Sequence, residues 1–148
     1  MNPPMTDAQL RVILADAQRD QRGAQLGGAN LEGFVLRGLN LRGAWLQGAN
    51  LVGVDLRDAC LSDAWLQCAD LRSANLAAAD LQRANLEHAN LTAANLQRAN
   101  LQSAQVGAAN LTHTDLRGAD LRDTYLGIPG IDRADVSTAR RAGGVLTA

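Results

Sequence analysis

The sequence is poor in aromatic residues and cysteine, and it contains no lysine. Phe, Trp and Tyr make up 3% of its 148 residues, so the core must be built mainly from aliphatic side chains. The 14 basic residues are all arginine and 15 residues are acidic, which leaves a formal net charge of −1. That balance lacks the basic footprint of a nucleic-acid-binding protein, and no direct nucleic-acid binding is expected. Two cysteines, Cys60 and Cys68, are too few for a disulfide scaffold and match no zinc spacing, so both are expected to be free thiols.

Long apolar runs and catalytic motifs are also missing. No stretch approaches the roughly 18 to 20 apolar residues that a membrane-spanning helix needs, and the first residues lack the pattern of a signal peptide. A cytoplasmic protein without membrane contact is therefore expected. His88 and His113 are the only histidines, and neither a Gly-rich phosphate loop nor a hydrolase or metalloprotease motif occurs. We expect no catalytic residue, no cofactor and no metal.

The dominant feature of the sequence is a repeat of five residues. From position 26 to position 126 every fifth residue is Leu, with Val106 as the single exception among 21 positions. The residue two before it is Ala at 16 of these positions, and the residue between them is Asn or Asp at 14. The repeating unit is therefore Ala-(Asn/Asp)-Leu-x-x.

A period of five excludes the simplest regular elements. On an α-helix five residues advance about 500°, so the leucines would spiral around every side. On a flat strand successive leucines would alternate between the two faces. A chain that runs extended for about three residues and then bends in the same sense points every Leu and Ala toward one axis. The pattern predicts an all-β solenoid, with Asn residues 20 apart, such as Asn30 and Asn50, in ladders along the stack.

The repeat resembles the pentapeptide-repeat proteins, whose units read A-(D/N)-L-x-x. The resemblance covers residues 24 to 128 and continues weakly through Ile131 and Ala134-Asp135-Val136. It implies a right-handed quadrilateral β-helix with four units per coil, about 5.5 coils over residues 24–138. Most members of that family are binding or structural proteins, and a minority shield DNA gyrase by imitating DNA.

The two ends of such a solenoid need covers, because each end exposes a strand edge. We expect an N-terminal segment, 1–23, that contains a short amphipathic capping helix over about residues 6–20. A capping box, Thr6-Asp7-Ala8-Gln9, begins it, and an apolar stripe follows. The cap is predicted to join that stripe to large residues of the first coil: Leu10, Ile13, Leu14, Phe34 and Leu39. The C-terminal tail, 139–148, has no clear helical period, and this end either folds over the last coil or meets a second subunit as a homodimer.

With 20 residues per coil, one side of the solenoid differs from the other three. Face one comprises residues 24–28, 44–48, 64–68, 84–88, 104–108 and 124–128. It carries one of the 21 charged residues between positions 24 and 138, Glu87, and all the Trp and Tyr of the chain. A charge-poor surface with aromatic residues is typical of an interface core. The predicted interaction face consists of Trp45, Trp65, Tyr125, Gln47 and Gln67; alternatively, the two indoles only stabilise neighbouring coils.

Three functions from different classes remain open. The favoured one is a non-enzymatic binding or scaffold protein, with a homodimer through face one or the C-terminal end as one possible assembly. The second is a DNA mimic that protects or inhibits gyrase or another topoisomerase, which the balanced charge disfavours because a phosphate backbone is densely negative. The third is an enzyme that uses Cys68 and His88, which the repeat would place in equivalent positions on adjacent coils.

Overall fold

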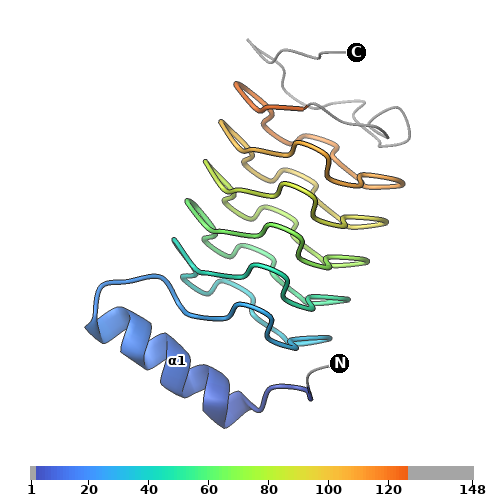
Figure 1. The fold of residues 1–148 in the computed structure, drawn as a ribbon. Helices are drawn as coiled ribbons and strands as arrows, with labels where there is room; N and C mark the ends of the chain where they lie inside the picture. The colour runs from blue at the N-terminus through green and yellow to red at the C-terminus, as the bar shows by residue number, and fades with distance from the viewer. Residues whose placement is uncertain (1–2, 127–148) are drawn as a thin grey trace.

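A computed structural model describes residues 3–126, which form one helix and a stack of square coils (Figure 1). Helix α1 spans Asp7–Arg19, and the chain then enters the first coil and climbs steadily away from the helix. The predicted final part of the repeat, 127–138, and the tail, 139–148, lie outside the described residues. So does the predicted contact through the C-terminal end.

The β-structure of residues 3–126 consists of isolated parallel bridges, each of which joins a residue to the one 20 positions later. The series begins with Gln25 and Trp45 and ends with Gln105 and Tyr125, and it recurs every five residues. Four bridges per 20 residues give each coil four sides. The register is constant along the stack. The backbone N–H of a core Leu donates to the carbonyl oxygen of the outward residue 19 positions later, as in Leu26 N to Trp45 O at 2.8 Å.

Leucine side chains fill the axis of the stack. Every Leu of the repeat from Leu26 to Leu126 is at most 4% exposed, and most of the alanines two residues before them are equally buried. The residue between them points outward, so the extended part of each unit alternates inward, outward, inward. Burial of aliphatic side chains thus replaces the aromatic core that the composition lacks.

Each corner is a tight turn with one residue in the left-handed region. The carbonyl oxygen of the core Leu accepts from the N–H three residues later, as in Ala29 N to Leu26 O at 3.1 Å. The third residue of this turn has a φ between 55° and 70° at every corner from Gly28 to Asp123. The combination is that of a type II turn, which favours glycine at that position. The first six corners use glycine, whereas Asp, Ala, Arg, Ser, His and Cys occupy later ones.

The repeated Asn and Asp residues stabilise these turns. Their Oδ1 atoms accept from the backbone N–H two residues later, as in Val52 N to Asn50 Oδ1 at 3.2 Å. The predicted ladder also exists in part: Asn50 Nδ2 donates to Asn30 Oδ1 at 3.0 Å. Ladder bonds recur in two further places, from Asn85 Nδ2 to Gln105 Oε1 at 3.3 Å and from Asn100 Nδ2 to Asp80 Oδ1 at 3.0 Å. The local bond recurs in many more units, so turn formation is the main role of this position.

Helix α1 lies across the first coil (Figure 1). Thr6 is its N-cap: Gln9 N donates to Thr6 Oγ1 at 3.3 Å, and Thr6 N donates to Gln9 Oε1 at 2.8 Å, which forms the capping box. Asp7 in the first turn and Arg19 in the last turn complement the helix dipole. Among residues 3–126 we find no helix with the length and hydrophobicity required to span a bilayer.

Candidate interaction face

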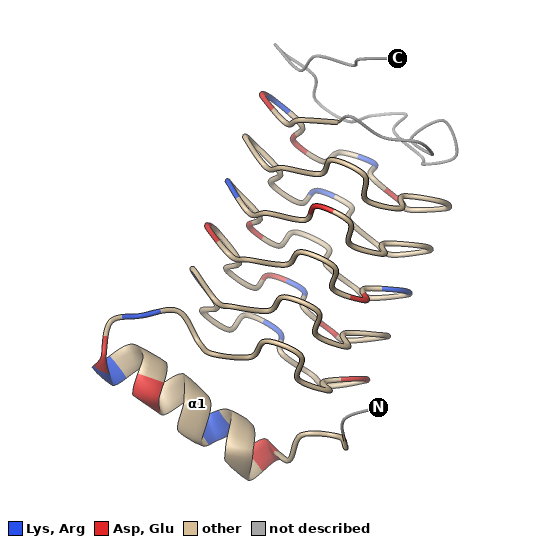
Figure 2. Ribbon diagram, in the orientation of Figure 1, with Lys and Arg blue, Asp and Glu red and all other residues tan. Residues whose placement is uncertain are grey.

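Face one, as far as the described residues show it, runs along one side of the rod from residue 24 to residue 126. Its single charged residue is Glu87. In Figure 2 the strands of the coils that run across the side toward the viewer are drawn mostly in tan, the colour of uncharged residues. The other three sides contain eight arginines and nine acidic residues between positions 24 and 126. A partner that contacts face one therefore displaces few charged groups from water.

Trp45 and Trp65 form the aromatic centre of this face. Both occupy the outward position that most units give to Asn or Asp, and a parallel bridge joins them on adjacent coils. Their ring centroids lie 6.3 Å apart with a tilt of 37°, within the range of favourable aromatic pairs. Trp45 is 50% exposed and Trp65 is 46% exposed. Half of each indole thus rests on its neighbours and half remains in water.

The other three predicted residues of the face have different surroundings. Gln47 and Gln67 are half-buried, and Gln67 Oε1 is buried with no hydrogen-bond partner among the described residues. Tyr125 is 57% exposed but lies three coils beyond Trp65, with Asn85 and Gln105 between them in the same column. The structure therefore brings Trp45 and Trp65 together and leaves Tyr125 separate.

Cys68 and His88 occupy equivalent corners on adjacent coils. Both are exposed, with φ values of 58°, and no hydrogen bond between them occurs in the described structure. Cys60 is half-buried, and its Sγ lies 3.3 Å from Ser62 Oγ. Residues 3–126 contain no group of three or more His, Cys, Asp or Glu side chains that could hold a metal ion. Within residues 3–126 no hydrogen bond from a third residue orients the ring of His88.

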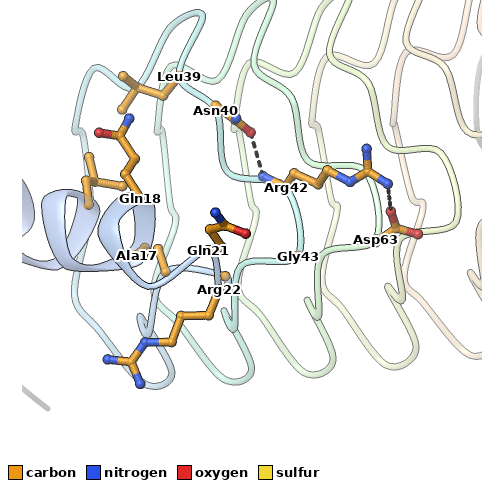
Figure 3. Close-up of a pocket in the computed structure, with 12 residues that line it drawn as sticks. Ala17, Gln18, Gln21, Arg22, Leu39, Asn40, Arg42, Gly43 and Asp63 are labelled. Atoms are coloured by element: carbon orange, nitrogen blue, oxygen red, sulfur yellow. Dashed lines mark hydrogen bonds and ion pairs between the residues drawn. The ribbon is translucent and has the colours of Figure 1, made fainter.

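The predicted cap residues lie where the helix meets the first coil. Leu10 is 6% exposed and belongs to the main hydrophobic cluster, and the partly buried cap residues pack against that cluster: Ile13, Leu14, Phe34 and Leu39. Beside the end of α1 lies a cleft of about 500 Å³ (Figure 3). On its rim Arg42 Nη2 lies 3.1 Å from Asp63 Oδ2, and Arg42 N donates to Asn40 Oδ1 at 3.1 Å.

Ion pairs neutralise the charged faces locally. In four units the Asp before the core Leu pairs with the Arg after it, at 2.6 Å between Nη2 and Oδ2: Asp55–Arg57, Asp70–Arg72, Asp115–Arg117 and Asp120–Arg122. The hydrogen bond from Arg57 lowers the pKa of Asp55 to about 2, and that from Arg117 does the same for Asp115. Sequence reasoning missed this pairing, although the spacing of Asp and Arg two residues apart carries its signal.

Comparisons with known proteins agree on one architecture. The sequence model described as Pentapeptide repeats matches in eight copies, over residues 22–58, 35–72, 69–105 and 107–126. The fold is similar to HetL, a pentapeptide repeat protein involved in heterocyst differentiation regulation in the cyanobacterium Nostoc sp. strain PCC 7120. The identity is 34% and the TM-score 0.56, over 85% of this chain and 65% of HetL, so the chain spans about two thirds of that protein's length.

A second solved structure shows the fold alone. The trypsin-treated form of QnrB1, a plasmid-mediated fluoroquinolone resistance protein, is 15% identical, with a TM-score of 0.52 over 84% of this chain and 70% of QnrB1. The sequence matches none of the curated proteins.

Proposed function

Because this chain belongs to the pentapeptide-repeat family, whose members form right-handed quadrilateral β-helices, we propose that it is a non-enzymatic binding protein that presents flat β-helix faces to a protein partner. The observation that carries the proposal is the Trp45–Trp65 pair on face one. Trp45 and Trp65 are 50% and 46% exposed, and exposed indoles lower solubility unless a partner covers them. Trp is also enriched among the hot-spot residues that contribute most of the binding energy of an interface. Family membership supports the non-enzymatic role, and among the described residues none is hydrogen-bonded to the ring of His88 to orient it toward Cys68.

The half-buried Gln67 adds polar specificity to this apolar centre. Its Oε1 has no partner among the described residues and sits in the coil that carries Trp65. A buried acceptor without a partner is costly, and a small rotation of the side chain would turn it toward a donor on an incoming surface. The proposed contact therefore combines two indoles with a few carboxamides and almost no charge.

The test is the double variant Trp45→Ala with Trp65→Ala. A matched control is Gln82→Ala with Gln102→Ala, because this pair also lies on adjacent coils and bonds side chain to side chain at 3.3 Å, but on another face. Both proteins are used for affinity capture from a lysate of the source organism, and their mass is measured by light scattering. We expect the tryptophan variant to keep its β-rich circular dichroism spectrum and to lose at least tenfold of a captured protein or of self-association, while the control loses neither. Unchanged binding by the tryptophan variant would refute the proposal, and an unfolded variant would make the indoles a structural stack.

The alternative of a DNA mimic is weakened by the charge distribution. Residues 24–126 contain eight arginines and ten acidic residues, and the four Asp–Arg pairs interleave the two signs on the same faces. No face exceeds a net charge of one unit, whereas duplex DNA carries one negative charge per about 1.7 Å. We expect gyrase supercoiling to be unchanged when the protein is titrated into the assay. Inhibition or protection at stoichiometric protein would favour the DNA mimic instead.

A further inference from the structure

The first coil has an open β-edge on the side where the chain enters. In later coils both backbone groups of the outward residue bond to the coil before it; for example, Asp55 N donates to Phe34 O at 2.9 Å, and Asp55 O accepts from Leu36 N at 2.7 Å. Val35 is the residue below Asp55 in the same column, and no coil precedes it. Neither the N–H nor the carbonyl oxygen of Val35 has a hydrogen-bond partner within residues 3–126. These groups are a template for one more strand.

The chain itself fills the corresponding place on the adjacent face. Met5 N donates to Asn30 O at 2.9 Å, the same bond that a core Leu makes to the outward residue of the following coil. Met5 is half-buried and packs against the hydrophobic cluster, as that Leu would. The extended segment then ends at Thr6, where α1 begins. The helix uses its backbone groups internally, so it covers the core without pairing with Val35.

A cleft of about 660 Å³ separates α1 from this edge. Its lining includes six apolar side chains, Leu10, Leu14, Phe34, Val35, Leu36 and Leu39, and three charged ones, Asp7, Arg11 and Glu32. Val35 is 74% exposed, the highest value among the exposed large hydrophobic residues. The open edge therefore has space beside it for an apolar side chain. The equivalent positions on two other faces are the polar Gln25 and Asn40, which offer no such surface.

We propose that the Val35 edge binds an extended peptide segment of a partner protein, which adds to the first coil as a parallel strand. One peptide residue donates its N–H to the Val35 carbonyl oxygen, and its side chain must be aliphatic, because it enters the cleft as Met5 enters the core beside Asn30. The residue two positions earlier accepts from the Val35 N–H and must be small, as Ala is in the repeat. The segment therefore reads small-x-aliphatic. Main-chain bonds supply affinity and the cleft supplies selectivity, which is the logic of strand addition.

This edge is separate from the Trp45–Trp65 surface, so the two sites are tested independently. The probe is the synthetic peptide acetyl-Gly-Ala-Asn-Leu-Gln-Gly-amide, and the control peptide carries N-methyl-leucine in place of leucine and lacks the required N–H. Amide hydrogen exchange of the full chain is followed by nuclear magnetic resonance. We expect saturating probe to slow exchange of the Val35 amide at least tenfold and the methylated peptide to leave it unchanged. Unchanged Val35 exchange with the probe, or equal protection by both peptides, overturns the proposal.

Two variants locate the site. Val35→Pro removes the donor and breaks no bond seen within residues 3–126, and we expect it to weaken probe binding at least tenfold in calorimetry. Gln25→Pro is the matched control, because it removes the equivalent donor on face one, which also has no partner within residues 3–126. It should bind the probe as the unmodified protein does. If Val35→Pro binds the probe with the same affinity as the unmodified protein, the proposal is overturned. It is also overturned if the free protein is a dimer that Val35→Pro converts to a monomer, because a second copy of the chain is then the occupant of the edge. If Val35→Pro does not fold, the exchange measurement on the unmodified chain decides.

Discussion

At the scale of single residues, the corner positions combine a strict backbone requirement with loose side-chain requirements. Thirteen corners from Asp58 to Asp123 place a residue other than glycine at a φ between 55° and 60°. This conformation costs about 1–2 kcal/mol for a residue with a Cβ, less for Asn and Asp. None of these residues is β-branched, which agrees with the steric reason for the cost. The repeat therefore tolerates stored strain at its corners, offset by the buried leucines between them.

Replacement of one strained alanine tests this interpretation. Ala78 has a φ of 57° and is exposed, whereas its neighbour Ala79 is 1% exposed and points inward. We expect Ala78→Gly to raise the free energy of unfolding by about 0.5–1 kcal/mol, the relieved strain less the greater freedom of glycine in the unfolded chain. Ala79→Gly should lower it by about 1 kcal/mol, because a buried methyl group is lost. Urea unfolding of both variants measures the difference, and destabilisation by Ala78→Gly would contradict the strain.

The Asp–Arg pairs predict a pH dependence of stability. The pKa of Asp55 and of Asp115 is about 2 in the folded protein, below the ordinary value of 3.8, because Arg57 and Arg117 donate hydrogen bonds to them. A pKa lowered by folding stabilises the protein above the unfolded value, and this contribution disappears as the pH falls from about 4 to about 2. The pairs are exposed on the arginine side, so each contributes at most about 1 kcal/mol.

The variant Asp55→Asn with Asp115→Asn isolates this contribution. Asn keeps the acceptor for the N–H two residues later and removes the ion pair. We expect the variant to be slightly less stable at pH 7 and to lose less stability between pH 4 and pH 2, as measured by thermal unfolding at each pH. Parallel curves for the two proteins would show that the pairs do not contribute.

At the scale of elements, helix α1 covers the core but leaves the β-edge open. Its apolar stripe places Leu10 in the hydrophobic cluster, and the exposed Val12 points away. A helix can bury side chains against the end of a solenoid, yet the backbone groups between its two ends bond within the helix and cannot extend the ladder. The segment before Thr6 makes one strand-like bond, from Met5 N to Asn30 O. The described residues before the helix make no other backbone bond to the first coil.

Deletion of residues 1–20 tests the helix as a cap. We expect the truncated chain to expose Phe34, Leu39 and the edge of the first coil, and to aggregate. Light scattering and thermal unfolding measure the effect. Two point variants serve as a matched pair: Leu10→Ala should cost about 2–3 kcal/mol, because a buried side chain is truncated, and Val12→Ala less than about 0.5 kcal/mol. A truncated protein that remained monomeric and equally stable would show that α1 caps nothing.

At the scale of the whole molecule, a constant register of 20 residues converts sequence position into surface position. Each face is a set of five-residue units 20 apart, so composition can differ from face to face without any change in the core. Face one differs from the others in this way, with one charge and two adjacent indoles, while the remaining faces balance Arg against Asp. A rod with unlike sides suits a protein that binds through one of them.

The sequence by itself determined the repeat, the inward and outward positions and the family. The reason is that a five-residue period with buried Leu permits one kind of coil, and a strict register assigns every residue to a column. It also indicated α1, because a capping box and an apolar stripe are local signals. Both the helix at Asp7–Arg19 and the neighbouring positions of Trp45 and Trp65 agree with those patterns.

Only the tertiary structure decided which outward groups are accessible and which are paired. The tilt of the two indoles, the buried Gln67 Oε1, the separation of Tyr125 and the ion pairs of Asp with Arg depend on rotamers and on neighbours one coil away. The open edge at Val35 depends on where the chain leaves its strand-like path for α1. The five-residue repeat shows which residues stack in one column. The first coil has another coil on one side only, and the repeat does not predict what lies on its other side.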